Sequence, residues 1–191
     1  MVKFNAPLVK WYNARFVILS WQFDSVKGHQ IRRNMKKINL NEVKEFVKNQ
    51  SLETKIYIGG DSERYNENGI WFADFTLAVV VHIDGKHGCK IFGEVQTERD
   101  YDQKQNRPRM RLMNEVYKVA DLYLSLQKML PEIEIQVHLD INPDEMYGSS
   151  CVINEAVGYI RGTCNVIPLV KPQAFAASYA ADRLKHVMRV A

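Results

Sequence analysis

The sequence lacks the signatures of several common classes of protein. Its three cysteines, Cys89, Cys151 and Cys164, are odd in number and far apart, and they form no CxxC pair. This pattern predicts reduced thiols in a cytoplasmic protein rather than a zinc site or a disulfide framework. The HExxH, GxSxG and P-loop motifs are also absent. The zinc-protease, serine-hydrolase and nucleotide-binding sites that depend on those motifs are therefore not expected.

Long apolar runs are missing as well. The longest, such as Leu77 to Val81, have only the length of a strand, and the N-terminus has no signal-peptide core. We therefore expect no association with a membrane. The 191 residues are 46% hydrophobic and 25% charged, which is typical of one globular domain with an appendage.

Acidic residues are scarce in the first 38 residues. This basic arm contains eight Lys or Arg but only one acid, Asp24, so it carries a formal charge of +7 and leaves −3 for residues 39–191. Its six aromatic residues are Phe4, Trp11, Tyr12, Phe16, Trp21 and Phe23. Cations interleaved with aromatic rings suit single-stranded nucleic acid, and the candidate phosphate contacts here are Arg32, Arg33, Lys36 and Lys37. Alternatively, the aromatic rings pack the arm onto the domain while its cations stay solvated.

The remaining pattern predicts an α/β fold. Residues 1–49 are expected to form an N-terminal extension that ends in a short helix capped by Asn39 or Asn41, and residues 50–191 a domain. The expected strands are 55–61, 71–83, 89–97, 133–141 and 166–170, and the expected helices are 108–130, 149–162 and a last one from 172 or 173. Asn68-Gly69 predicts a type I′ hairpin turn between the first two strands.

This order predicts a mixed five-stranded sheet, 3-2-1-4-5, flanked by helices. Strands 1 and 4 would be parallel neighbours at the point where the strand order reverses, and such points bind ligands in open α/β sheets. Asp61 ends strand 1 and Asp140 lies near the end of strand 4. Adjacent strands lie about 4.8 Å apart, so the two carboxylates could share a divalent cation. Gly59 and Gly60 would leave the backbone open to a ligand.

Two further acids lie on the predicted helices. Glu115 lies within an apolar stripe, so it needs a metal, a salt bridge or a route to solvent. Asp182 lies on the last helix, at the edge of the stripe that packs on the sheet. It is either a candidate site residue or an exposed acid bonded to His186 or Lys185.

Three motifs carry a resemblance to a known family over about residues 50–191. They are Ile56 to Ser62, Val137 to Asn142, and Val170 to Ser178 leading to Ala181-Asp-Arg183. The chain resembles the ribonuclease H-like superfamily and, more narrowly, the YkuK-type ribonuclease-H-like family. The resemblance implies Asp61, Glu115, Asp140 and Asp182 as ligands for two Mg²⁺ or Mn²⁺ ions, with Glu63 as an alternative to Glu115. The chain departs from the family in having Gly60 where a Thr is common.

Such a site would serve a metal-dependent nuclease acting on RNA, DNA or a hybrid, because hard oxygen ligands select Mg²⁺ or Mn²⁺. His186 would relay a proton or contact the phosphate, or it would simply cap its helix.

Three arginines, Arg107, Arg109 and Arg111, lie at the start of a predicted helix, where the dipole disfavours cations. Either a bound phosphate compensates this unfavourable interaction, or the arginine side chains are solvated. Lys171 is a further phosphate-contact candidate. The competing hypothesis is a non-catalytic module that binds nucleic acid or protein.

Overall fold

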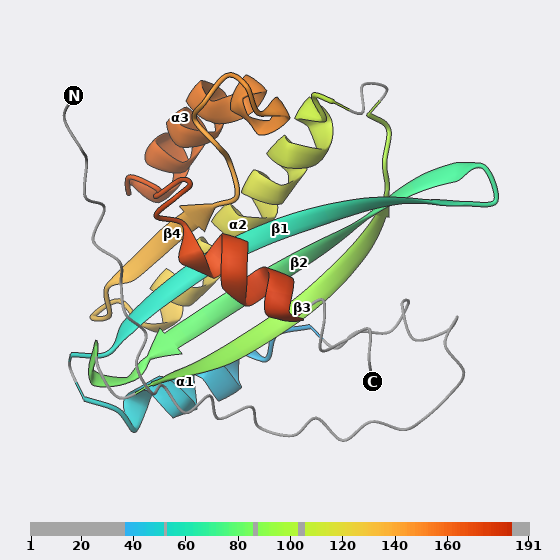
Figure 1. The fold of residues 1–191 in the computed structure, drawn as a ribbon. Coiled ribbons are helices and arrows are strands. Elements are labelled where there is room, and N and C mark those ends of the chain that lie inside the picture. The colour runs from blue at the N-terminus through green and yellow to red at the C-terminus, as the bar shows by residue number, and fades with distance from the viewer. Residues whose placement is uncertain (1–36, 52, 86–87, 103–105, 185–191) are drawn as a thin grey trace, which may run out of the picture.

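The computed structural model describes residues 37–51, 53–85, 88–102 and 106–184. Arg32, Arg33, Lys36 and His186 therefore lie outside the described residues. The described chain has a mixed α/β fold in which helices flank both faces of a four-stranded sheet of order β3-β2-β1-β4 (Figure 1). The strands are β1 (Lys55–Glu67), β2 (Ile70–His82), β3 (Cys89–Arg99) and β4 (Ile135–Leu139). The helical elements are α1 (Leu40–Lys48), η2 (Ile83–Gly85), α2 (Arg109–Met129), η3 (Gly148–Val152), α3 (Ile153–Cys164) and η4 (Ala176–Ala181).

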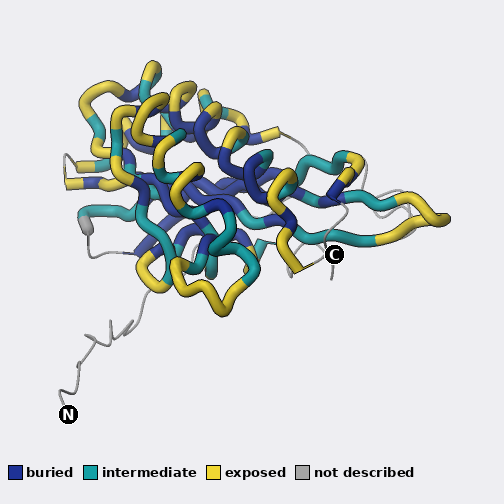
Figure 2. The backbone as a smooth tube through the Cα atoms, turned by 90° about the horizontal axis from the view of Figure 1, so that it is seen from above, coloured by how far each residue is buried: buried dark blue, intermediate teal, exposed yellow. Residues whose placement is uncertain are grey.

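The first two strands form a long hairpin. Asn68 and Gly69 both have positive φ, 53° and 82°, as a type I′ turn requires. This two-residue turn pairs Glu67 with Ile70 and sets the register of the whole hairpin. Because pairing continues up to the turn, β1 runs six residues further than the expected end at Asp61. The outer part of the hairpin projects from the body and is exposed at its tip (Figures 1 and 2).

The predicted fifth strand is reduced to an isolated bridge. Leu169 pairs in parallel with His138. Its N–H donates to the carbonyl of Val137, and its carbonyl accepts from the N–H of Leu139, both at 2.8 Å. Pro168 precedes it and cannot donate to a ladder, because proline has no N–H. A fifth strand is therefore not confirmed, although the segment lies beside β4 as the order 3-2-1-4-5 expects.

The larger core lies between the sheet and helices α1, α2 and α3. Ile56 and Ile58 of β1 are fully buried in it, as are Val43 of α1 and Leu126 of α2. Burial of each such side chain contributes roughly 1.5–3 kcal/mol. Asn39 caps α1 by accepting from the N–H groups of residues 41 and 42. The short helix assigned above to the N-terminal extension is thus part of the folded body.

The opposite face of the sheet is covered by η4, which crosses β1 and β2 (Figure 1). A Cβ added at Gly59 would lie only 2.3 Å from the backbone nitrogen of Ala177, so the helix backbone rests directly on the strand. On the other face, a Cβ at Gly60 would lie 2.9 Å from Val119 and 3.2 Å from Glu115. The two glycines therefore make room for helices, and the expectation that they leave space for a ligand is wrong.

The last helix differs from a regular α-helix. It begins at Ala176 rather than at residue 172 or 173, and it has π-helical geometry to Ala181. Its four alanines, at 176, 177, 180 and 181, are buried against the sheet. Single-turn π-helical segments occur frequently at functional sites.

Candidate functional site

Asp61 and Asp140 lie side by side where β4 ends. The last parallel pair between β1 and β4 is Gly60 with Leu139, and the two aspartates are the next residues along each strand. Because side chains alternate along a strand, Asp61 points to the same face as Gly59, which is the face covered by η4. Asp140 contacts η4 itself, through Ser178. The structure therefore brings both half-buried carboxylates to one face of the sheet.

Both oxygens of Asp140 have partners within the chain. Its Oδ1 accepts a hydrogen bond from the hydroxyl of Ser178 at 3.0 Å, and its Oδ2 lies 2.9 Å from the ammonium of Lys171. Lys171, expected above as a phosphate contact, is thus an ion-pair partner of a proposed metal ligand. Neither partner of Asp140 could be identified from spacing, because they depend on how residues 169–178 run past the end of β4.

Glu115 reaches the aspartates from the other side of the sheet. Its side chain on α2 is 2% exposed, and it lies under Gly60 of β1. The pKa of Glu115 is raised to about 8, mainly by burial and next by the charge of Asp61. Asp140 adds a smaller increase, while a hydrogen bond with Ser62 opposes it. Three carboxyl groups therefore share one electrostatic environment, and a buried glutamate at this point keeps its proton at neutral pH.

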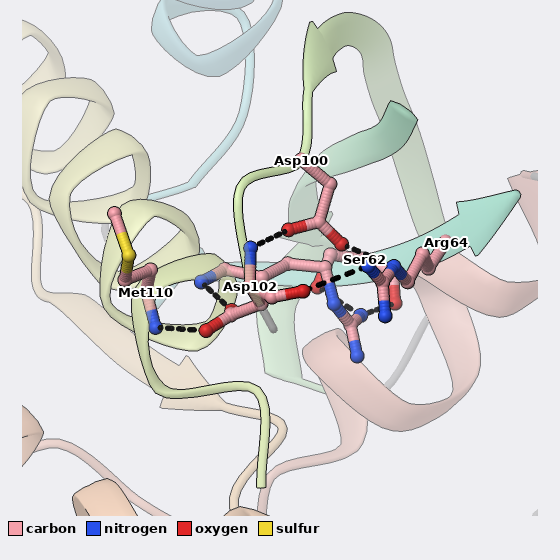
Figure 3. Close-up of polar contacts among 6 residues, drawn as sticks. Ser62, Arg64, Asp100, Asp102 and Met110 are labelled. Atoms are coloured by element: carbon pink, nitrogen blue, oxygen red, sulfur yellow. Dashed lines mark hydrogen bonds and ion pairs between the residues drawn. The ribbon is translucent and has the colours of Figure 1, made fainter. Parts of the chain in front are cut away.

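The start of α2, which positions Glu115, is fixed by Asp102 (Figure 3). The buried carboxylate of Asp102 accepts from the backbone N–H of Met110 at 3.2 Å and from that of Arg111 at 2.6 Å. It thus satisfies donors at the helix N-terminus and places a negative charge at the positive end of the dipole. The Arg111 side chain turns inward and donates to Ser62 of β1, to its hydroxyl at 2.9 Å.

A second ion pair ties the same loop to the hairpin. Arg64 of β1 lies 2.8 Å from the carboxylate of Asp100 and donates to the backbone carbonyl of Asp102 at 2.7 Å (Figure 3). Asp100 in turn accepts from the N–H of Asp102 at 2.8 Å. The guanidinium also stacks on Trp71, 4.1 Å from the ring centre. These contacts hold the N-terminus of α2, and with it Glu115, against β1.

The remaining acidic candidates lie around this centre. Asp182 is exposed and follows Ser178, the hydroxyl partner of Asp140, by four residues on the same helix. Glu63 is half-buried on β1, on the same face as Asp61, and pairs in register with Asp74. Glu115, for its part, is electrostatically linked to both Asp61 and Asp140.

The basic candidates are dispersed in the described chain. Arg107 and Lys37 are exposed, and Arg109 is exposed but forms an ion pair with Glu155 of α3 at 2.5 Å. Arg111 is half-buried and engaged by Ser62. Asp102 relieves the dipole conflict expected at this helix start within the chain itself.

His138 is a further residue at the site, and sequence analysis did not single it out. It lies two residues before Asp140 and is fully buried. Its Nδ1 accepts a hydrogen bond from the backbone N–H of Ala176 at 3.0 Å, and its ring contacts Tyr57 and Phe175. Burial lowers the pKa of His138 to about 4, so the ring stays neutral and can accept. Alternation along β4 places His138 with Gln136 on the face opposite the apolar side chains, so the sequence pattern indicated neither its burial nor its partner.

The donor chemistry suits a hard divalent cation, since Asp61, Glu115 and Asp140 supply only carboxylate oxygens. In the portion of the chain that is described, however, no group of three His, Cys, Asp or Glu side chains is arranged so that it could hold a metal ion. The ligand atoms of these residues are thus of the type that such a cation prefers, and binding would require Asp140 or Glu115 to change its present partners.

Comparison with known proteins gives one result. A family model described as ribonuclease H-like matches residues 39–186, which include α1 and every described element of the sheet. No curated protein and no solved structure matches the chain. Among the described helices, none has the length and apolar character needed to cross a bilayer.

Proposed function

The chain belongs to the ribonuclease H-like family, and we propose that it is a divalent-metal-dependent nuclease that hydrolyses phosphodiester bonds of nucleic acid. The observation that supports the proposal is the electrostatic coupling of three carboxyl groups that come from separate elements. Asp61 and Asp140 follow the last parallel pair of β1 and β4, and Glu115 is buried where its pKa responds to both. A buried acid beside two others is costly for folding, so a role in binding a cation explains its presence.

The proposed ligands are Asp61, Glu115, Asp140 and Asp182, and the proposed ions are two Mg²⁺ or Mn²⁺. When bound, such ions activate water and stabilise the leaving oxygen of a phosphodiester. The chain's own residues position these ligands: Ser178 orients the Asp140 carboxylate, and Ser62 hydrogen-bonds Glu115. His186, outside the described residues, is proposed to relay a proton.

The proposed substrate is RNA, DNA or a hybrid of the two. The basic arm supplies a charge of +7, whereas residues 39–191 carry −3. The phosphate contacts would come from Arg32, Arg33, Lys36 and Lys37 in and beside the arm, and from Arg107, Arg109, Arg111 and Lys171 in the domain. Counter-charge of this kind provides affinity without sequence specificity.

The test is a panel of labelled RNA, DNA, hybrid and junction substrates incubated with Mn²⁺. Native protein should cut at least one of them, and Asp140→Asn should reduce the rate by at least about a hundredfold, which corresponds to roughly 3 kcal/mol of barrier. Asp121→Asn is the matched control, because Asp121 is an exposed acid on α2. Equal rates for native protein and Asp140→Asn would overturn the proposal.

A second candidate function is a non-catalytic module that binds nucleic acid or protein. It is favoured by the pairing of Asp140 with Lys171, since that carboxylate is already neutralised. A calorimetric Mn²⁺ titration of native protein and of Asp61→Asn separates the two functions. Uptake that Asp61→Asn abolishes supports the nuclease, whereas absence of uptake together with nucleic-acid binding supports the module.

A further inference from the structure

Asp140 forms an ion pair with Lys171 at the site. The ammonium lies 2.9 Å from Oδ2, and the side chains are 36% and 19% exposed, respectively. Ser178 donates to the other oxygen at 3.0 Å. The carboxylate that the proposed function assigns to a cation is therefore already supplied with one positive charge and one hydroxyl donor by its own chain.

Lys171 is held at this position by its backbone as well as by its charge. Its N–H donates to the carbonyl of Ile141 at 3.0 Å, directly beyond the end of β4. On the N-terminal side, Leu169 is bridged to His138. The segment is thus anchored to β4 along its length, and a four-carbon side chain from this anchor can reach Asp140 or swing into solvent.

The surroundings of the ammonium are acidic. Besides Asp140, the charge of Asp61 acts on the same environment from β1, and Glu115 is buried below them. The charge of Lys171 offsets that of Asp140, and it thereby reduces the repulsion between the carboxylates of Asp140 and Asp61 when no divalent ion is bound. Arg111 lowers the pKa of Glu115, but its side chain is committed to Ser62.

We propose that Lys171 is a built-in counter-ion that occupies Asp140 in the metal-free protein and competes with a divalent cation for that carboxylate. This inference rests on the proposed function, because it concerns the same ligand. Binding of Mn²⁺ or Mg²⁺ displaces the ammonium from Oδ2, so part of the binding free energy is spent on breaking the ion pair. The displaced Lys171 then lies beside the site as a free cation, positioned to contact a substrate phosphate.

The test compares Mn²⁺ affinity by isothermal titration calorimetry in the full-length protein. Lys171→Met removes the charge but keeps the length of the side chain, so it should bind Mn²⁺ severalfold more tightly, up to about tenfold for an ion pair of this exposure. Lys171→Arg keeps the charge and should bind with nearly native affinity. Lys55→Met is the matched control, since Lys55 pairs with Glu134 at 3.0 Å at the opposite end of β1 and β4. It should leave Mn²⁺ affinity unchanged.

A second measurement needs no metal. In the presence of a chelator, Lys171→Met should lower the melting temperature of the native protein, whereas the same substitution in an Asp140→Asn background should not, because no charge then remains to be compensated.

The outcomes separate this inference from the proposed function. Mn²⁺ uptake by native protein with unchanged or weaker uptake by Lys171→Met would overturn the competition alone. Absence of uptake by both proteins would overturn the competition and the proposed metal site together. Uptake by Lys171→Met alone would support the competition and would favour the non-catalytic module for the native chain.

Discussion

The backbone N–H of Ala176 donates a hydrogen bond to the imidazole Nδ1 of His138 at 3.0 Å. This bond joins β4, near its C-terminal end, to the first residue of η4, and it is completely buried. The ring can accept it only while neutral, as the lowering of the His138 pKa to about 4 by burial ensures. The bond therefore sets where η4, with Ser178 and Asp182, begins on the sheet.

His138→Phe should destabilise the protein by about 1–3 kcal/mol, because it leaves the N–H of Ala176 buried without an acceptor. Urea denaturation followed by circular dichroism measures the loss. A change below about 0.5 kcal/mol would mean that the N–H finds another acceptor and that His138 does not anchor η4.

The metal-free protein should lose stability as pH rises from about 5 to 8, because of Glu115. Its pKa is raised from 4.5 to about 8 in the folded state, so the folded protein retains a proton that the unfolded chain releases. The contribution of this group is full below pH 4.5 and is lost as pH approaches 8, at a rate of up to about 1.4 kcal/mol per pH unit.

Glu115→Gln should remove that part of the pH dependence and should be the more stable protein at pH 8 in the presence of a chelator. Thermal denaturation between pH 5 and 8 checks both expectations. If native protein and Glu115→Gln have parallel stability profiles, Glu115 does not titrate in this range.

Much of the fold could be predicted from local patterns, and the main discrepancy is the length of β1. Asn68-Gly69 predicts a two-residue turn, and such a turn requires pairing up to its edges. The strand that contains Asp61 therefore had to continue to Glu67, as β1 does. Pro168 is a second local signal: because proline has no N–H to donate to a ladder, it argues against a regular fifth strand.

The partners in the site could not be predicted, because they come from distant segments. Asp102 caps α2 from a loop seven residues before the helix begins. Lys171 reaches Asp140 only because its segment is bonded beyond the end of β4. The sequence predicts that Asp61 of β1 lies beside Asp140 just beyond β4, but the contacts of these acids depend on the tertiary path of the connecting segments.

The role of the basic residues nearest the domain can be tested by neutralising four of them together. A variant that carries Arg32→Gln, Arg33→Gln, Lys36→Gln and Lys37→Gln should bind single-stranded nucleic acid more weakly. If all four contact phosphates, the slope of log K against log salt should become shallower by about 3, since each contact contributes roughly 0.7. Fluorescence anisotropy at several salt concentrations measures the slope. An unchanged slope with unchanged affinity would show that these cations do not contact the phosphates.

Two glycine-to-alanine substitutions should have opposite effects on stability. In Gly59→Ala, the new Cβ would lie 2.3 Å from the backbone nitrogen of Ala177 and 2.5 Å from the carbonyl carbon of Ala176. A backbone cannot move aside as a side chain can, so η4 must shift off the sheet, at a cost of about 1–3 kcal/mol or more. That shift should also weaken the contact of Ser178 with Asp140.

Gly158→Ala is the matched control: Gly158 is exposed on α3, and its new Cβ would meet no atom within 4 Å. This variant should gain up to about 1 kcal/mol from helix propensity. Urea denaturation of both variants decides the matter, and an equal effect of the two substitutions would contradict the close packing of η4 on β1.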